Sequence, residues 1–526
     1  MSHPPLLKST LVPTVLAVGL LTAAVPAQLA GSYTINPLWP AFPGNFPSLS
    51  AATAALASQG IAGPVTFEVF DDAGPYTEAS PFVTTSGPFA PNTAVLVLGQ
   101  WVGSSAINRV TFRAAPGEAP ILDASSQSMG VFWGGADYVT IEGFEIRNAI
   151  HDAISLYSEA SHGVATNAII RRCVLHDCGG TGVTVYGNSS FPVDTLIESN
   201  VFYSLQRTNA GSFSTTGRFG YVTTRRSTNT RVVHNTFVAD TGVGGSFCVL
   251  GAYPSGTTEI PYGEFSNNVV FKTAGAGKPI FRIQSPANTS APAPTICESN
   301  CFYDLTASPF ALWGTNAGTT AVTLLDWQNT SQKDLTSTWA DPQFLDFAAR
   351  DFRIQVTSPC LAAATLDFGP TTDIDGQPRL ASRDRGADEL SGAQRLYLGA
   401  GCSGSNASPS RLSTNTWPFL GNAGFALHAD AVAPSQPVFF AASFGAAPAP
   451  IQLGGSGCAI WIDPSTAGIL PGFAAADPFG HANLLVPLPS DAGFAGLNLY
   501  YQAIGLDPAT SLGVTTSNAL QCVLGF

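Results

Sequence analysis

The chain has 526 residues, of which 45% are hydrophobic and only 11% are charged, and its formal net charge is −13. This length exceeds what one hydrophobic core usually holds, so we expect two domains. The 53 glycines and 39 prolines are typical of many short strands joined by turns, and they exclude long helices as the main element. The negative charge and the lack of a basic run in the sequence exclude nucleic acid as an expected partner.

Residues 1–27 have the pattern of a secretory signal peptide. Lys8 precedes an apolar run from Leu11 to Ala24, and Ala27 ends a small-residue cleavage site. The run is short and is interrupted by Pro13, so we predict no membrane span. The nine cysteines also fit an oxidising compartment. We therefore expect the protein to be secreted or held at the cell surface.

A short amphipathic helix is predicted close to the start of the mature chain. Ser48 is a favourable N-cap, Leu49 and Leu56 lie on one helical face, and Gly60 ends the helix. A helix laid across the first strands of a repeat array would cover its exposed core and strand edges. We assign residues 28–64 to such a cap.

The strongest feature of the sequence is a strand-turn unit that recurs along the chain. In the first four copies the last apolar positions are separated by 29, 27 and 35 residues, a period that indicates a solenoid. One unit has too little apolar surface for a core, but stacked units align their Ile, Val and Phe side chains into a continuous one. The copies are Ile141–Ile146, Ile170–Leu175, Ile197–Phe202, Val232–Phe237, Phe265–Phe271 and Ile296–Phe302.

The repeat alignment predicts two rows of polar side chains with structural roles. Asparagines fall at one position of the repeat, where their amides can bond along the stack and tolerate left-handed backbone angles. This row contains Asn200, Asn235 and Asn300, with Asn267 or Asn268 as a fourth member. Glu142, Arg171 and Glu198 occupy another equivalent position and are expected to form an ion ladder worth little per pair.

Segments at both ends of the array carry a family resemblance. The opening resembles the N-terminal cap of pectin methylesterase-like proteins, on Phe46–Ser50, Val65–Glu68 and Tyr76–Glu78. The closing segment looks like the last coils of bacterial right-handed β-helix repeat proteins, on Asp341–Phe344, Asp351–Ile354, Ser358–Leu361, Asp373–Arg379 and Arg385–Glu389. Over residues 32 to 390 the chain thus resembles the secreted pectin-lyase-like family. The resemblance implies a right-handed parallel β-helix, which we place at residues 65–390.

The remaining residues predict a second domain. Alternating segments separated by Gly and Pro suggest a small β-sandwich at 397–526, after a linker at 391–396. The region resembles a C-terminal domain of many secreted planctomycete-like bacterial proteins, on Gly401–Gly404, Pro418–Gly421, Gly457–Ala459 and Tyr500–Ala503. If Cys402 and Cys458 pair, Cys522 becomes a candidate for an unpaired thiol. The predicted fold class is therefore all-β, a capped β-helix followed by a β-sandwich.

The resemblance implies polysaccharide lyases, hydrolases and esterases, but their signatures are incomplete here. A lyase needs an acidic calcium site with a basic residue, and a hydrolase needs two carboxylates across the glycosidic bond. Arg282–Gln284 departs from the Arg-Ile-Lys of galacturonase-like relatives, whose Gly-His-Gly and Asn-Thr-Asp signatures are also missing from the sequence. Whether the chain is an enzyme stays open. An enzyme of this kind would be a polysaccharide lyase or a glycoside hydrolase.

Two pairs of aspartates invite a metal-site interpretation. Asp71 and Asp72 are adjacent and would point to opposite faces of a strand, which favours a turn. Asp373 and Asp375 lack the other ligands of a calcium loop and match the terminal-coil pattern instead. We predict no metal site and no cofactor.

One cluster of polar residues is the candidate site. Arg147, His176 and Tyr203 fall at equivalent positions of successive coils, with Asp177 next to His176 and His151 and Asp152 just beyond Arg147. Imidazole, carboxylate and guanidinium groups together can bind an acidic sugar and transfer protons. The candidate catalytic residues are Arg147, His176 and Asp177, and the candidate substrate-binding residues are His151, Asp152 and Tyr203.

Two functions from different classes fit this sequence. The leading hypothesis is a secreted β-helix protein that binds extracellular or cell-surface polysaccharide, with processing of that polymer left open. The alternative is a noncatalytic surface, adhesion or structural protein in which the β-helix is a rigid spacer. The expected partner is a polysaccharide or a cell-surface glycan, and the sequence does not identify the oligomeric state.

Overall fold

The computed structural model describes most of the chain from residue 28 to residue 525. The predicted signal peptide, residues 1–27, lies outside the described residues. Further residues outside the description are 41–43, 85–90, 160, 189, 208–219, 242–247, 253–261, 286–293, 316–317, 366–368, 391, 406–407, 455–456, 472 and 526. No helix in the described part of the chain is long and apolar enough to span a membrane.

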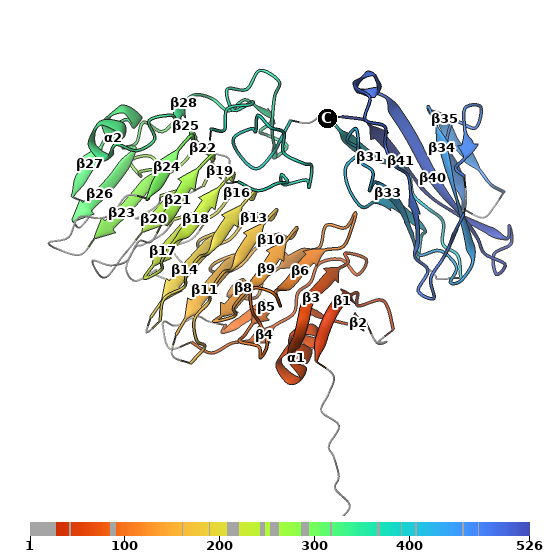
Figure 1. Ribbon diagram of the computed structural model, residues 1–526, viewed down its shortest axis with the longest axis horizontal. Coiled ribbons are helices and arrows are strands. Elements are labelled where there is room, and N and C mark those ends of the chain that lie inside the picture. Colours follow the sequence, from red (N-terminus) through yellow and green to blue (C-terminus); the bar gives the residue numbers. More distant parts are fainter. Residues whose placement is uncertain are drawn as a thin grey trace, which may run out of the picture.

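Most of the N-terminal domain is built from three long sheets whose neighbouring strands are almost all parallel (Figure 1). The first sheet contains, in order, β2 (Asn45–Phe46), β1 (Leu29–Ile35), β3 (Ile61–Val69), β6 (Val110–Ala114), β9 (Val139–Glu142), β12 (Ile169–Arg171), β15 (Leu196–Glu198), β18 (Thr230–Val233), β21 (Tyr262–Ser266) and β24 (Ile296–Glu298). The second sheet contains β28 (Thr338–Trp339), β25 (Cys301–Asp304), β22 (Val269–Lys272), β19 (Thr236–Ala239), β16 (Val201–Tyr203), β13 (Val174–His176), β10 (Glu145–Arg147) and β7 (Ile121–Asp123). The third contains β27 (Thr319–Ala321), β26 (Ala311–Thr315), β23 (Phe281–Ser285), β20 (Leu250–Ala252), β17 (Val222–Arg225), β14 (Val183–Gly187), β11 (Ile154–Ser158), β8 (Met129–Gly134), β5 (Thr93–Leu98) and β4 (Ser80–Pro81).

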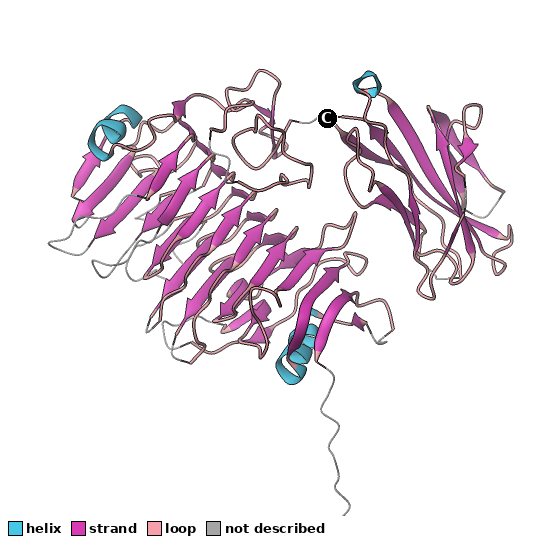
Figure 2. Cartoon of the chain, in the orientation of Figure 1, coloured by secondary structure: helices cyan, strands magenta, loops and turns pink. Residues whose placement is uncertain are grey.

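Each coil contributes one strand to each sheet in turn, as β9, β10 and β11 do, and the next coil repeats the order with β12, β13 and β14. The register follows the sequence repeat, because Ile170 pairs with Ile141 on one side and with Ile197 on the other. This is the arrangement of a parallel β-helix, and the predicted all-β fold class is confirmed. Figure 2 shows how little of the chain is helical.

Each recurring unit contains two strands and the corner between them. Glycine or a polar residue makes the corner with a positive φ, for example Gly143 at 79° and Ser199 at 50°. The predicted asparagine row follows these corners, and Asn268 rather than Asn267 is its fourth member. The row members Asn200, Asn235, Asn268 and Asn300 are fully buried.

The asparagine row is a chain of hydrogen bonds along the stack. Asn200 Nδ2 donates to Asn235 Oδ1 at 3.0 Å, Asn235 Nδ2 donates to Asn268 Oδ1 at 3.2 Å, and Asn268 Nδ2 donates to Asn300 Oδ1 at 3.2 Å. The expected stacking is confirmed, but the left-handed angle belongs to the residue before each asparagine, such as Ser199 or His234. The side-chain amides therefore stabilise the corners by hydrogen bonding. The backbone leaves the sheet at each corner, and its peptide groups need partners there.

Both ends of the solenoid are covered by a helix. The predicted cap is α1 (Leu49–Gln59), with the Ser48 side chain accepting from Ala51 N and with Leu49 and Leu56 fully buried. At the far end lies α2 (Leu324–Ser331), which the sequence analysis did not predict. Thr323 and Asp326 form a capping box there, and the indole of Trp327 is fully buried against the last coils.

After the last coil the chain turns back along the side of the solenoid. The described part of residues 341–390, called the strap below, adds no strand to the three long sheets. Arg379 Nη2 donates to Ser199 Oγ at 3.2 Å, and Gly386 N donates to the carbonyl of Asn267 at 2.8 Å. Arg379 also pairs with Glu389 at 3.1 Å, and both side chains are fully buried. The strap contains β29 (Phe344–Asp346) and β30 (Asp351–Ile354).

The C-terminal domain is a β-sandwich, as predicted. A core that includes Leu427, Phe440 and Leu520 lies between its sheets. Cys402 and Cys458 form the expected disulfide, and Cys522 is a buried free cysteine. One sheet holds β31 (Gln394–Leu398), β41 (Val514–Val523), β40 (Asn498–Leu506), β34 (Pro437–Ser443), β37 (Gly468–Ile469) and β38 (Ala474–Ala475), and smaller sheets hold β32 (Arg411–Thr414), β33 (Ala426–Asp430) and β39 (Ala482–Leu485), and β35 (Ala446–Gln452) and β36 (Ala459–Ile462).

Candidate functional site

The candidate catalytic residues lie on the second sheet of the solenoid. Arg147 ends β10, His176 ends β13 and Tyr203 ends β16, and these three residues are directly paired in register. The expected alignment of the three side chains is therefore confirmed. We call these residues, together with Asp123, Glu145 and Asp177, the polar stripe.

Both ring nitrogens of His176 have partners within the polar stripe. Nδ1 lies 2.8 Å from Asp177 Oδ2, and Nε2 lies 3.2 Å from Glu145 Oε1. The Tyr203 ring stacks on the imidazole at a centroid distance of 4.6 Å and an interplanar angle of 7°. Only 9% of the His176 side chain is exposed. The imidazole is thus held by its neighbours and offers no nitrogen directly to a substrate.

Arg147 is also paired, but part of its surface stays open. Its Nε lies 3.0 Å from Asp123 Oδ2, its Nη1 lies 2.7 Å from Glu145 Oε1, and 29% of its side chain is exposed. The hydrogen bond from His176 lowers the pKa of Glu145, and the charge of Arg147 lowers it further. Glu145 is not among the site residues predicted from the sequence. A period of two along β10 could have found it, since residues 145 and 147 share one face of the strand.

The strap reaches the far end of the polar stripe. The guanidinium of Arg350 lies 5.2 Å from the centroid of the Tyr203 ring, and Phe352 packs on that ring at 5.3 Å. Burial raises the pKa of Tyr203 to about 12, so its hydroxyl stays protonated at neutral pH. A hollow of about 260 Å³ lies beside Tyr203 and is lined partly by Arg350, Asp351 and Arg353.

Asp152 and His151 do not belong to the polar stripe. Asp152 is fully buried and accepts hydrogen bonds from Ser155 Oγ at 2.8 Å, Thr181 N at 2.9 Å and Thr184 Oγ1 at 3.0 Å. These bonds tie neighbouring coils together where the chain enters the third sheet. His151 precedes Asp152 in the same turn, and burial lowers its pKa. The hydrogen bonds described for Asp152 thus go to residues outside the polar stripe.

The ion ladder on the first sheet is confirmed. Arg171 pairs in register with Glu142 and Glu198, and its guanidinium lies 2.7 Å from Glu142 Oε2 and 3.9 Å from Glu198 Oε1. Arg172 adds a second cation to Glu142 at 2.8 Å. The two sheets therefore carry comparable rows of paired charge, and only the row on the second sheet includes stacked rings.

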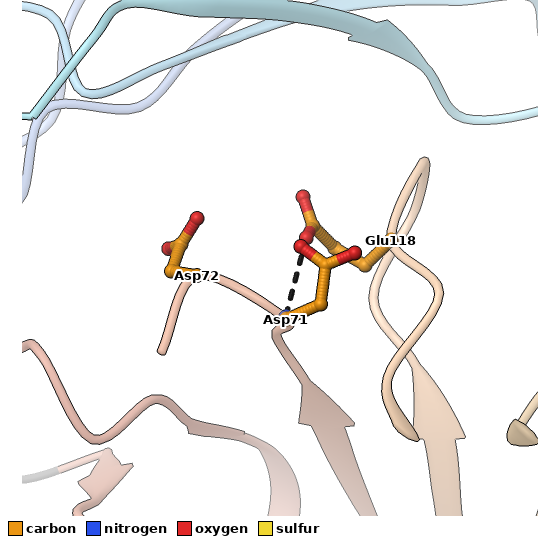
Figure 3. A group of neighbouring side chains, drawn as sticks. All are labelled: Asp71, Asp72 and Glu118. Atoms are coloured by element: carbon orange, nitrogen blue, oxygen red, sulfur yellow. Dashed lines mark hydrogen bonds between the residues drawn. The ribbon is translucent and has the colours of Figure 1, made fainter. Parts of the chain in front are cut away.

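An acidic group lies where the C-terminal domain meets the first coils (Figure 3). One carboxylate oxygen from each of Asp71, Asp72 and Glu118 lies within 4.8 Å of the others. Asp71 and Asp72 follow β3 in a turn, as predicted, and Asp71 N donates to Glu118 Oε2 at 3.3 Å. Burial and the hydrogen bond with Asp71 together raise the pKa of Glu118 to about 9.

Arg411 of the C-terminal domain provides the positive charge in this group. Its Nη1 lies 3.0 Å from Asp71 Oδ1 and 3.1 Å from Glu118 Oε2. Asp72 instead accepts from Asn36 Nδ2 at 2.7 Å. The guanidinium thus pairs with two of the three carboxylates, and we assign the group to the contact between the two domains.

Comparisons with known proteins find similar solved structures at low sequence identity. No protein-family model matches the chain, and no curated protein matches it. Pectate lyase Pel9A is 12% identical with a TM-score of 0.28, over 69% of this chain and 98% of that chain. The enzymatically active domain of bacteriophage CBA120 tailspike protein 2 is 11% identical with a TM-score of 0.18, over 87% and 61%. A mutant tailspike protein of Escherichia coli bacteriophage HK620, in complex with pentasaccharide, is 10% identical with a TM-score of 0.18, over 90% and 83%.

Proposed function

We propose that this chain is an exported protein that binds extracellular polysaccharide along the polar stripe without cleaving it. The carrying observation is the in-register row of Arg147, His176 and Tyr203, with its paired charges partly open to solvent. Neighbouring strands of a sheet repeat at about 4.8 Å, so the solenoid presents polar groups at short and regular intervals. A rigid row of donors and acceptors suits an extended polymer, because the protein side chains lose little conformational freedom when the polymer binds.

The partners of His176 favour binding over catalysis. A general base needs a nitrogen within hydrogen-bond reach of the substrate proton. In His176 both nitrogens are engaged, by Asp177 and by Glu145, and the ring lies under Tyr203. Arg147 is similarly held by two carboxylates. The exposed edges of these groups can accept and donate hydrogen bonds to sugar hydroxyls while the pairs stay intact.

The test is a binding screen of the mature protein against acidic and neutral polysaccharides, with reducing ends and unsaturated products measured in parallel. We expect binding to at least one polymer and no product. Arg147→Ala removes a charged hydrogen-bond donor, so affinity falls by about tenfold or more. Arg171→Ala is the matched control, because it removes an arginine from the ladder on the first sheet.

The outcomes separate three possibilities. If product forms and Asp177→Ala abolishes it, the polar stripe is a catalytic site and the enzyme hypothesis is favoured. Equal losses from Arg147→Ala and Arg171→Ala would move the binding surface away from the stripe. If the protein binds none of the polymers in the panel, the proposal is refuted and the rigid-spacer alternative is favoured.

A further inference from the structure

A second possible site lies between the C-terminal domain and the first coils. Two adjoining hollows of about 530 and 340 Å³ share four lining residues, and we call them together the interdomain cleft. The shared residues are Trp39, Asp430, Phe479 and His481. The volumes of the two hollows fall within the range of about 300 to 1,000 Å³ that is usual for small-molecule sites. Such sites often lie at domain interfaces.

Aromatic rings from both domains line the interdomain cleft. The Trp39 ring lies 4.7 Å from the Phe70 ring within the N-terminal domain and 4.2 Å from the imidazole of His481 across the interface. Trp39 is only partly buried and Phe479 is exposed, so both present apolar surface to a ligand. Flat apolar faces of this kind pack against the C–H face of a sugar ring, as they do against other apolar surface.

The charged side chains in the lining of the cleft are predominantly acidic. Asp72, Asp430, Asp477 and Glu68 contribute carboxylates from three different segments. Arg411 is the arginine of this lining, and it is already paired with Asp71 and Glu118. Asp430 is shared with His481, whose Nδ1 lies 2.7 Å from Asp430 Oδ1.

Asp72 and Asp430 show what this charge requires. Burial raises the pKa of Asp72 and repulsion from the negative charge of Asp430 adds to this rise, while the hydrogen bond with Asn36 and the charge of Arg411 act against it. A cation placed between the two carboxylates would remove this repulsion, whereas an anionic ligand would increase it. With Arg411 and His481 counted as cations, the lining still holds more carboxylates than cations, so it favours a ligand with an apolar ring face and a positive charge.

We propose that the interdomain cleft binds an amino sugar whose ammonium group faces Asp72 and Asp430 and whose ring packs on Trp39 and Phe479. The site is separate from the polar stripe and does not depend on the function proposed for the stripe. It would give the protein a second sugar contact, for a cationic unit, and only while the two domains are docked.

The test is calorimetric titration at pH 6 with a fully deacetylated glucosamine tetramer. Its N-acetylated form, a galacturonate tetramer and a tetralysine peptide are the comparison probes. We expect the glucosamine tetramer to bind at least tenfold more tightly than each of the other three. Asp72→Asn and Asp430→Asn should each weaken this binding by about tenfold, since each removes one charged partner.

Matched variants make the result specific. Asp463→Asn removes an exposed carboxylate from the C-terminal domain outside the cleft, and its affinity should equal that of the parent protein. Trp39→Phe should retain most of the binding that Trp39→Ala loses. Arg147→Ala should leave binding in the cleft unchanged, which separates this proposal from the function of the stripe.

Equal affinity for tetralysine would show that the cleft attracts any positive charge and does not recognise a sugar ring. Equal affinity for the acetylated tetramer would show that the carboxylates do not recognise the ammonium group. Either result overturns the proposal, as does the absence of binding.

Discussion

Replacing Asn235 by alanine tests whether the asparagine row holds the solenoid together. Asn235 Oδ1 accepts from both Asn200 N and Asn200 Nδ2 at 3.0 Å, and its Nδ2 donates to the carbonyl of Ile197 at 2.9 Å. All of these groups are buried, and alanine removes the acceptor of Asn200 N, whereas Asn200 Nδ2 keeps the carbonyl of Ile170 at 3.0 Å. Each orphaned buried group destabilises by about 1 to 3 kcal/mol. Orphaning of the Asn200 backbone amide should therefore destabilise the solenoid by about 1 to 3 kcal/mol, a sizeable part of a typical folding free energy.

Thermal unfolding and hydrogen exchange measure this effect at two levels. The unfolding midpoint of the solenoid should fall, and amide protection should drop first in β15 and β18, which flank the lost bonds. Asn329→Ala is the matched control, because Asn329 is exposed on α2 and its substitution should change stability by less than about 0.5 kcal/mol. If the two variants unfold alike, the row is not what joins the coils, and the reasoning fails.

Three further predictions concern the parts of the chain that close the structure. Glu118 has a folded pKa of about 9, above its ordinary value, so it contributes stability that is complete below about pH 4.5 and is lost as the pH rises through 9. Glu118→Gln should flatten this decline in the unfolding midpoint between pH 5 and 9, and an unchanged slope would contradict the assignment. Reduction of the disulfide from Cys402 to Cys458, 56 residues apart, should destabilise the C-terminal domain by about 4 kcal/mol and leave solenoid unfolding unaltered, as seen by calorimetry with and without reductant. Arg379→Ala leaves Glu389 buried without its partner, at about 3 to 5 kcal/mol, and limited proteolysis should then cut the strap faster than in an Arg353→Ala control on its exposed side.

Sequence reasoning succeeded where the signal is local or strictly periodic. The cap helix has its N-cap and apolar face within a dozen residues, and the coils repeat the same strand pattern. The register of Ile141, Ile170 and Ile197 followed from that repeat, and with it the alignment of Arg147, His176 and Tyr203. What the repeat could not show is which partner each aligned side chain takes. Glu145 claims a nitrogen of His176, and that contact changes the chemistry of the site.

The interdomain features were out of reach because their partners are far apart in the chain. Arg411 lies 340 residues from Asp71 and 293 residues from Glu118. No spacing rule joins positions so distant, and the sequence reading of Asp71 and Asp72 as a turn was correct without revealing what the turn contacts. Trp39 and His481 meet for the same reason, through the docking of two separately folded units.

The path of the strap has a mechanical consequence. Because the chain turns back along the stack, the C-terminal domain contacts the first coils, and Arg411 pairs there with Asp71 and Glu118. A force applied at residue 28 and at the C-terminus would act first on this contact between the C-terminal domain and the first coils. The coils would bear load only after the contact had broken. The contact between the two domains also forms late in synthesis. Coils can stack as they leave the ribosome, but Asp71 and Glu118 wait for Arg411 until the strap and the start of the second domain have been made.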